Sequence, residues 1–205
     1  MIFFATPCYR SDPNKSVEFN YKIANELKLK NASACTLQDY PNIEVARSLL
    51  ISEFHKEKFC SYVFLRDDDI DITAEVVYTM LAADVPAIMV PYKLRTLNRF
   101  DVVKNTSGEC LWGGLGCALI RRDVIDKLWQ DYFDELHFYQ DGQLKVHLFR
   151  QEFAEINGQR EYMKEDHAFW YRVRTSGFKI DILENQLITH AGITSKYPSE
   201  INVNA

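Results

Sequence analysis

The most informative part of the sequence is YVFLRDDDID, residues 62–71. Its first half is rich in aromatic and β-branched residues, which favour strands, and three consecutive aspartates follow. Adjacent carboxylates repel one another unless a positive charge lies between them. A divalent cation is the natural candidate, because oxygen ligands suit Mg²⁺ or Mn²⁺, which keep positions open for phosphate oxygens. The stretch therefore indicates either a metal site for a nucleotide diphosphate at the end of a strand or, more simply, a solvated acidic turn.

Strand and helix patterns alternate along the first half of the chain. Strands are expected at 2–5, 34–37, 62–66 and 86–91, and helices after Ser16, Asn42 and Thr73. This alternation predicts an α/β domain with a mostly parallel central sheet flanked by helices. Its ligands should bind beyond the carboxyl ends of the strands, where the acidic triplet lies.

The second half of the chain is less regular. The expected elements are an irregular loop at 98–110, a glycine-rich loop at 113–116 before a strand at 118–120, a helix over 124–129 capped by Asp123, a small antiparallel hairpin within 138–149 turning at Asp141-Gly142, a helix over 166–173 ended by Gly177, and one or two strands within 179–188. No repeat or linker divides the chain, so we expect a single domain.

Composition excludes several classes of protein. The 205 residues are 47% hydrophobic, which is enough for a full core in one domain. A net charge of −5 without a long basic run argues against a nucleic-acid binder. Five cysteines without a CxxC pair indicate reduced, mostly buried thiols. No signal peptide and no apolar run near the ~20 residues of a membrane span are visible, so we expect a soluble cytoplasmic protein.

Two acidic groups carry the candidate chemistry. In an extended chain successive side chains alternate between faces, so we expect Asp67 and Asp69 to share a face and Asp68 to point elsewhere. Glu165 and Asp166 open a helix, where acids ordinarily do no more than complement the helix dipole. Near a metal that activates a leaving group, however, a carboxylate at this position can deprotonate an incoming hydroxyl. The sequence therefore indicates a metal-binding pair and a candidate base.

His190 and the glycine-rich loop are weaker candidates. His190 follows an apolar strand; a neutral imidazole is a common metal ligand beside carboxylates, but a lone histidine is as often a surface residue. The loop at 113–116 permits close approach of a substrate, yet it lacks the Walker lysine-serine ending and the Rossmann glycine spacing. The ordinary phosphate-loop classes are therefore poorly supported.

The order of these motifs resembles that of nucleotide-sugar glycosyltransferases of the GT-A fold, in particular small viral, phage and bacterial members with a DXD motif. The resemblance covers about residues 3–192 and is carried by TPCY at 6–9, VAR at 45–47, FLRDDDI at 64–70, VPYK at 90–93, GLGCALIRR at 114–122, EDHAF at 165–169 and THAG at 189–192. It implies one Rossmann-like GT-A domain over 1–205, with a donor-binding half at about 1–95, an acceptor and catalytic half at about 96–195 and a tail at 196–205.

The resemblance also implies a role for each matching residue. The base and ribose would be bound by Thr6, Pro7, Tyr9 and Arg47, the donor phosphate or sugar by Lys93 and Gly114 with the rest of its loop, and Mn²⁺ or Mg²⁺ by Asp69, with Asp67 beside it and His190 completing the site. Asp166 would be the catalytic base, supported by Glu165. Arg66 departs from the pattern, because relatives often carry an apolar or acidic residue there. It leaves open which two of the three aspartates form the pair, so Asp68 stays a candidate.

The implied activity is that of a metal-dependent hexosyltransferase. It would move a sugar from a nucleotide diphosphate donor, by resemblance a UDP-sugar, to a hydroxyl of a glycan or glycoconjugate, with inversion. One alternative is a metal-dependent nucleotidyltransferase, which should carry a glycine-rich, basic triphosphate-binding stretch that residues 6–10 do not resemble. A non-catalytic nucleotide-sugar-binding module is the other alternative, and the presence of Asp69, Asp166 and His190 argues against it.

Overall fold

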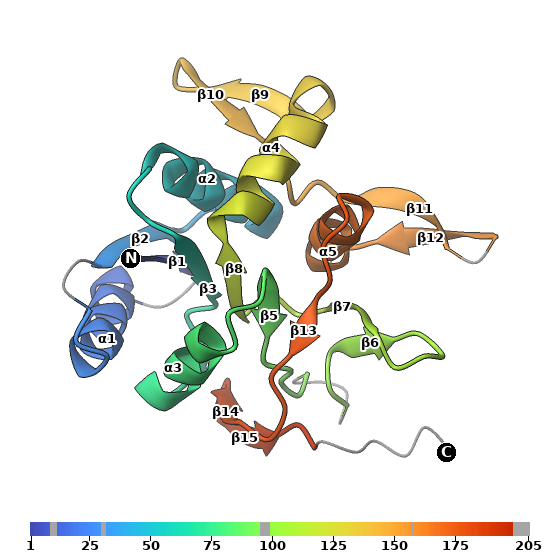
Figure 1. Ribbon diagram of the computed structural model, residues 1–205. Helices are drawn as coiled ribbons and strands as arrows, with labels where there is room; N and C mark the ends of the chain where they lie inside the picture. Colours follow the sequence, from blue (N-terminus) through green and yellow to red (C-terminus); the bar gives the residue numbers. More distant parts are fainter. Residues whose placement is uncertain (9–11, 30–31, 95–98, 157, 199–205) are drawn as a thin grey trace.

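The central feature of the protein is a six-stranded, mostly parallel sheet (Figure 1). The computed structural model describes residues 1–8, 12–29, 32–94, 99–156 and 158–198. The sheet has the order β13-β5-β8-β3-β1-β2, made of β1 (Ile2–Cys8), β2 (Ala32–Gln38), β3 (Tyr62–Arg66), β5 (Ala87–Met89), β8 (Cys117–Arg121) and β13 (Asp181–Ile182). Only β8 runs antiparallel to its neighbours, β3 and β5. The predicted α/β fold class is therefore confirmed.

Helices cover both faces of this sheet. They are α1 (Pro13–Glu26), α2 (Ile43–Lys56), α3 (Ala74–Ala82), α4 (Arg122–Leu136) and α5 (Glu165–Thr175). Alternate residues of β1 enter two separate cores: Phe3 packs with apolar residues of α2, α4 and α5, whereas Phe4 packs with those of α1 and α3. This double cover explains why every residue of β1 is buried.

Four smaller antiparallel sheets surround the central one, more than the single hairpin expected. They are β6 (Val102–Lys104) with β7 (Cys110–Gly113), β9 (His137–Gln140) with β10 (Gln143–Val146), β11 (Glu152–Ile156) with β12 (Gln159–Met163), and β4 (Ile70–Asp71) with β14 (Leu187–His190) and β15 (Ile193–Lys196). The hairpin predicted at Asp141-Gly142 is confirmed as β9–β10, and both turn residues have positive φ, as a two-residue hairpin loop requires. Figure 1 shows the β9–β10 and β11–β12 hairpins projecting from the body.

Several predicted element boundaries are corrected. The first helix begins at Pro13 rather than after Ser16, because Asp12 is its N-cap and accepts a hydrogen bond from the Asn14 backbone at 2.9 Å. Asp123 is not the N-cap of α4, because α4 begins at Arg122 and Asp123 lies in its first turn. The Asp123 carboxylate pairs with Arg121 at 2.7 Å. The stretch expected to be an irregular loop at 98–110 contains β6. The N-cap predicted at Asn42 is confirmed.

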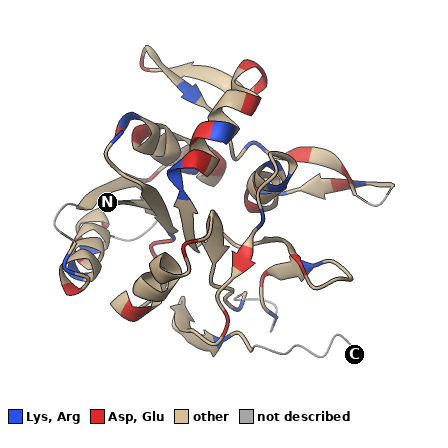
Figure 2. Cartoon of the chain, viewed as in Figure 1, with Lys and Arg blue, Asp and Glu red and all other residues tan. Residues whose placement is uncertain are grey.

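The distribution of charged residues and the state of the cysteines agree with what the composition predicts. In Figure 2, acidic and basic segments are mixed on α4 and scattered over the other elements. All five cysteines are free thiols, and burial raises the pKa of Cys110 and of Cys117 to about 12, so these two pack as neutral side chains. Within the described residues, no helix is long and apolar enough to cross a bilayer.

Candidate functional site

The three aspartates after β3 lie in a turn. The Ile70 amide donates a hydrogen bond to the Asp67 carbonyl at 3.1 Å, and regular strand structure ends at Arg66. The expectation that Asp67 and Asp69 share one face of an extended chain is therefore wrong, because the chain reverses between them. Their carboxylates meet different partners: Asp67 contacts Arg47, and Asp69 lies near His190.

Arg66 holds this turn in place from inside the protein. Its side chain is buried, and its Nη1 donates to the carbonyls of Asp67 at 3.2 Å and Ile70 at 2.8 Å. Its Nε donates to Asn20 Oδ1 at 3.2 Å, and Asn20 in turn donates to the Thr6 hydroxyl at 3.0 Å. Arg66 thus ties the end of β1 to the acidic turn. Thr6 is fully buried in this network, and its role toward a nucleotide stays a prediction.

Arg47 joins the two acidic segments of the sequence. From α2, its Nη2 donates to Asp67 Oδ1 at 2.8 Å, and its Nη1 lies 3.6 Å from Glu165 Oε1. Burial alone lowers the pKa of Arg47, but the charges of Asp67 and Asp166 outweigh burial and raise it, so the guanidinium stays charged. Nη1 is buried and has no hydrogen-bond partner among the described residues. The turn after β3 and the start of α5 therefore form one site around a buried cation.

Asp166 has the properties of a base poised near neutral pH. It lies in the first turn of α5, and its Oδ1 accepts a hydrogen bond from the His167 amide at 2.8 Å. Burial, followed by the negative charge of Glu165, raises the pKa of Asp166 to about 6. A carboxylate with a pKa in this range can both hold and release a proton under physiological conditions.

Strand pairing brings Asp69 and His190 together although they are far apart in sequence. β14 pairs antiparallel with β4, so that His190 lies opposite Ile70, and the Ala191 amide donates to the Asp69 carbonyl at 2.9 Å. His190 Nδ1 lies 2.9 Å from the Lys93 carbonyl, which can only accept, so Nδ1 carries the proton. The other ring nitrogen, Nε2, lies 3.7 Å from Asp69 Oδ1. Among the described residues, however, Asp67 does not join Asp69 and His190 in a group of possible ligand atoms within 4.8 Å, so the structure does not bring the predicted metal ligands together. The metal assignment stays a prediction.

The glycine-rich loop packs so closely on this site that side chains are excluded from it. A Cβ at Gly116 would lie 2.6 Å from Asp67 Oδ2 and 2.8 Å from the Tyr92 hydroxyl, and one at Gly114 would lie 2.5 Å from that hydroxyl. The Gly116 amide also donates to the Tyr92 hydroxyl at 3.2 Å. The glycines therefore let the backbone of residues 114–116 lie close to the acidic turn and to Tyr92.

We expect Gly116→Ala to lower the free energy of unfolding by about 1–3 kcal/mol, because the added methyl displaces the Asp67 carboxylate from Arg47. Thermal and chemical unfolding measure the effect. Gly108→Ala is the control, since its Cβ meets no atom within 4 Å and only its positive φ adds strain. Unchanged stability of the Gly116 variant would contradict the close packing.

A pocket of about 290 Å³ lies at the carboxyl ends of β1 and β2, beside the start of α2. It is lined by Pro7, Cys8, Leu37, Tyr40, Pro41, Ile43 and Ala46. Ala46 precedes Arg47 in α2, but Arg47 and its acidic partners do not line this largely apolar pocket. Pro7 is one of the residues predicted to bind the nucleotide, whereas Tyr9 lies outside the described residues.

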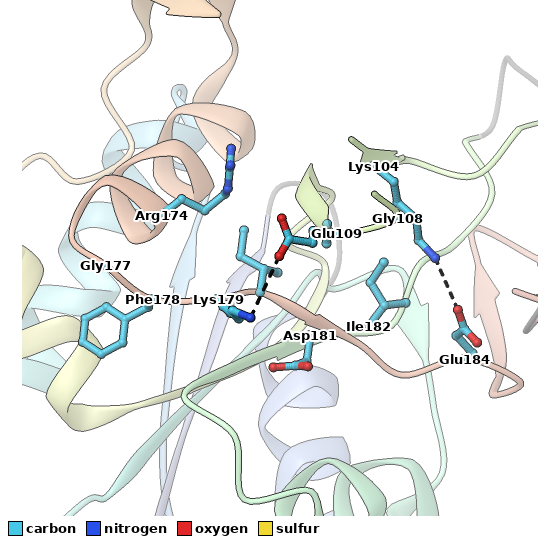
Figure 3. Close-up of a pocket in the computed structure, with 12 residues that line it drawn as sticks. Lys104, Gly108, Glu109, Arg174, Gly177, Phe178, Lys179, Asp181, Ile182 and Glu184 are labelled. Atoms are coloured by element: carbon cyan, nitrogen blue, oxygen red, sulfur yellow. Dashed lines mark hydrogen bonds and ion pairs between the residues drawn. The ribbon is translucent and has the colours of Figure 1, made fainter. Parts of the chain in front are cut away.

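A larger pocket, of about 540 Å³, lies away from these residues, along β13 at the edge of the sheet (Figure 3). None of the predicted site residues lines it. Its cations are partly neutralised, since Lys104 pairs with Glu184 at 3.3 Å and Lys179 with Glu109 at 3.9 Å (Figure 3). This pocket therefore does not take part in the site built around Arg47.

Comparison with known proteins supports the fold. The sequence matches no protein-family model and no curated protein. The fold is similar to that of A197 from STIV. The two align over 100% of this chain and 98% of that chain, with a TM-score of 0.54 and 16% identity. A putative glucose-1-phosphate thymidylyltransferase from Bacillus anthracis aligns over 93% of this chain and 89% of its own, with a TM-score of 0.50 and 10% identity.

A glycosyltransferase involved in glycosylation of the major capsid of PBCV-1 aligns less well, over 65% of this chain and 67% of its own, with a TM-score of 0.41 and 10% identity. At such identities, the similarity to A197 and to the thymidylyltransferase shows a shared fold and nothing finer.

Sequence reasoning missed two residues of the site. Asp101 and His167 lie with Asp166 in a group whose ligand atoms are all within 4.8 Å of one another. The position of His167 directly after Glu165 and Asp166 could have indicated its place in the site. Asp101 had none, because it lies in a stretch without periodicity and reaches the site only through tertiary contacts. Lys93 contributes its carbonyl to His190, and its ammonium lies 5.8 Å from the centre of the Phe100 ring, so its predicted contact with the donor stays open.

Proposed function

We propose that this protein is a metal-dependent glycosyltransferase that moves a sugar from a UDP-sugar to a hydroxyl of a glycan or glycoconjugate. The observation that carries the proposal is the convergence of two acidic segments, the turn containing Asp67 and the helix start containing Asp166, on buried Arg47. One segment is suited to the donor's metal and the other to a base. A group transfer from a nucleotide needs these two parts in one place.

Each end of the transfer has its own residues. Asp69 and His190 would hold the metal, which would supply positive charge for the departing diphosphate. Asp166 takes the proton from the acceptor hydroxyl as its oxygen forms a bond to the anomeric carbon, while the bond from that carbon to the diphosphate oxygen breaks. Attack from the face opposite the diphosphate inverts the configuration. Arg47 keeps Asp67 and Glu165 oriented between the two ends.

The first test is calorimetric titration of UDP into the protein with Mn²⁺, repeated with excess chelator. We expect UDP to bind only with the metal, and Asp69→Ala to weaken binding by about tenfold or more. Asp71→Asn is a matched control, because Asp71 is exposed and follows in the same acidic stretch. If neither UDP, GDP nor dTDP binds under any condition, the proposed function is wrong.

A nucleotidyltransferase is the second candidate, favoured by the similarity to the putative thymidylyltransferase. Against it, the described end of β1, Thr6-Pro7-Cys8, offers no basic side chain to a triphosphate. The two reactions leave different products. Release of UDP from UDP-sugars supports glycosyl transfer, whereas release of pyrophosphate from a nucleoside triphosphate and a sugar 1-phosphate supports the alternative. Metal-dependent UDP binding without either product would indicate a binding module.

A further inference from the structure

Two titratable side chains that the proposed transfer does not use lie beside its base. His167 Nε2 is 3.7 Å from Asp101 Oδ1 and 3.9 Å from Asp166 Oδ1. The imidazole therefore lies between two carboxylates, one from the start of α5 and one from the segment that precedes β6. All three side chains are partly buried, so water screens their charges incompletely.

The fold holds Asp101 and His167 in place. The Asp101 amide donates to the Tyr92 carbonyl at 3.1 Å, and the Asp101 carbonyl accepts from the Gly114 amide at 3.2 Å. The His167 ring lies 5.8 Å from the Trp112 ring, centre to centre, on the face of β7 that packs against α5. Asp101 is thus fixed by its backbone and His167 by an aromatic neighbour.

The charges around His167 favour its protonated form. Burial lowers the pKa of His167 and Lys164 also opposes its charge, but the attraction of the Asp101 and Asp166 carboxylates outweighs both and raises it. Glu165 and Asp101 raise the pKa of Asp166, whereas His167 and Arg47 lower it. The ionisation of Asp166 therefore depends on whether His167 is charged.

We propose that His167 and Asp101 are positioning residues for Asp166: Asp101 holds the imidazolium of His167, which keeps the Asp166 carboxylate ionised and oriented. The proposal rests on the proposed function only where it names Asp166 as the base. The arrangement of the three groups is a property of the free protein, so it is testable without donor or acceptor.

The first experiment measures the titration of the His167 imidazole by NMR in the full chain, with His167→Gln to assign its signals. We expect the pKa of His167 to lie above about 6.5, the ordinary histidine value, and to fall in Asp101→Asn. Asp126→Asn is the matched control, since Asp126 pairs with a different histidine, His55, at 3.1 Å. An ordinary pKa for His167 that Asp101→Asn leaves unchanged would overturn the proposal, whatever the protein transfers.

The second experiment follows hydrolysis of a UDP-sugar by His167→Gln as pH varies. Loss of the positive charge raises the pKa of Asp166, so the acid limb of kcat should move to higher pH, with about a tenfold loss near pH 6 that disappears at alkaline pH. KM for the donor should not change. An equal loss at every pH would mean a merely structural role and would overturn the positioning. Absence of UDP binding would instead refute the proposed function and leave the NMR result standing.

Discussion

Replacing Asp166 by Asn is expected to lower sugar transfer by about 10²–10⁴-fold while UDP still binds with Mn²⁺. Asn keeps the size of Asp and an oxygen that can accept the His167 amide hydrogen bond, so α5 should start in the same way. It cannot take a proton from an acceptor hydroxyl. The loss should therefore appear in kcat, measured as release of UDP from UDP-sugar with acceptor or water, and not in calorimetric UDP affinity.

The pH profile gives an independent check on Asp166. Because burial and Glu165 raise its pKa to about 6, the carboxylate is protonated and inactive below that pH and ionised above it. Wild-type turnover should rise through about pH 6, and the residual turnover of Asp166→Asn should lack that rise. Equal loss of nucleotide affinity in Asp69→Ala and Asp166→Asn would contradict the separation of metal side and base.

The sequence predicts those parts of the fold that depend on local patterns. The apolar run at 62–65 identifies a central strand, and Asn42 marks the start of α2. Glu165 and Asp166 open a helix as expected. Each of these features depends on neighbours within a few residues, which is the range over which hydrophobic periodicity and capping are informative.

The parts of the fold that the sequence does not predict depend on contacts between residues far apart in the chain. Antiparallel insertion of β8 between β3 and β5 has no local signal, and neither has the β4–β14 pairing that brings His190 to Asp69. The acidic triplet was expected to be extended because its neighbours are strand formers, but buried Arg66 binds two carbonyls of this segment and stabilises a turn. Similarly, Asp101 is brought to the site by backbone hydrogen bonds with Tyr92 and Gly114, which are distant in sequence.

Replacing Arg47 by Met is expected to lower the free energy of unfolding by about 3–5 kcal/mol. Arg47 is only 4% exposed, and its guanidinium is the cation between Asp67 and Glu165. Met fills much of the same space, so the loss would come from carboxylates left without their counter-charge rather than from a cavity. Chemical unfolding of both proteins measures the difference. Arg121→Met is the control, because Arg121 pairs with Asp123 at the surface, where ion pairs contribute little to stability.

The destabilisation by Arg47→Met should also depend on pH. Arg47 lowers the pKa of Asp166, so its removal raises that pKa further above the unfolded value. A group whose folded pKa is raised stabilises the fold at low pH and loses this contribution as pH rises through the folded value. The deficit of the variant should therefore be largest above the raised pKa that Asp166 has in the variant, shrink as pH falls from there to about 6, and stay constant below that. A small, pH-independent loss like that of Arg121→Met would show that Arg47 is not the cation on which the two acidic segments depend.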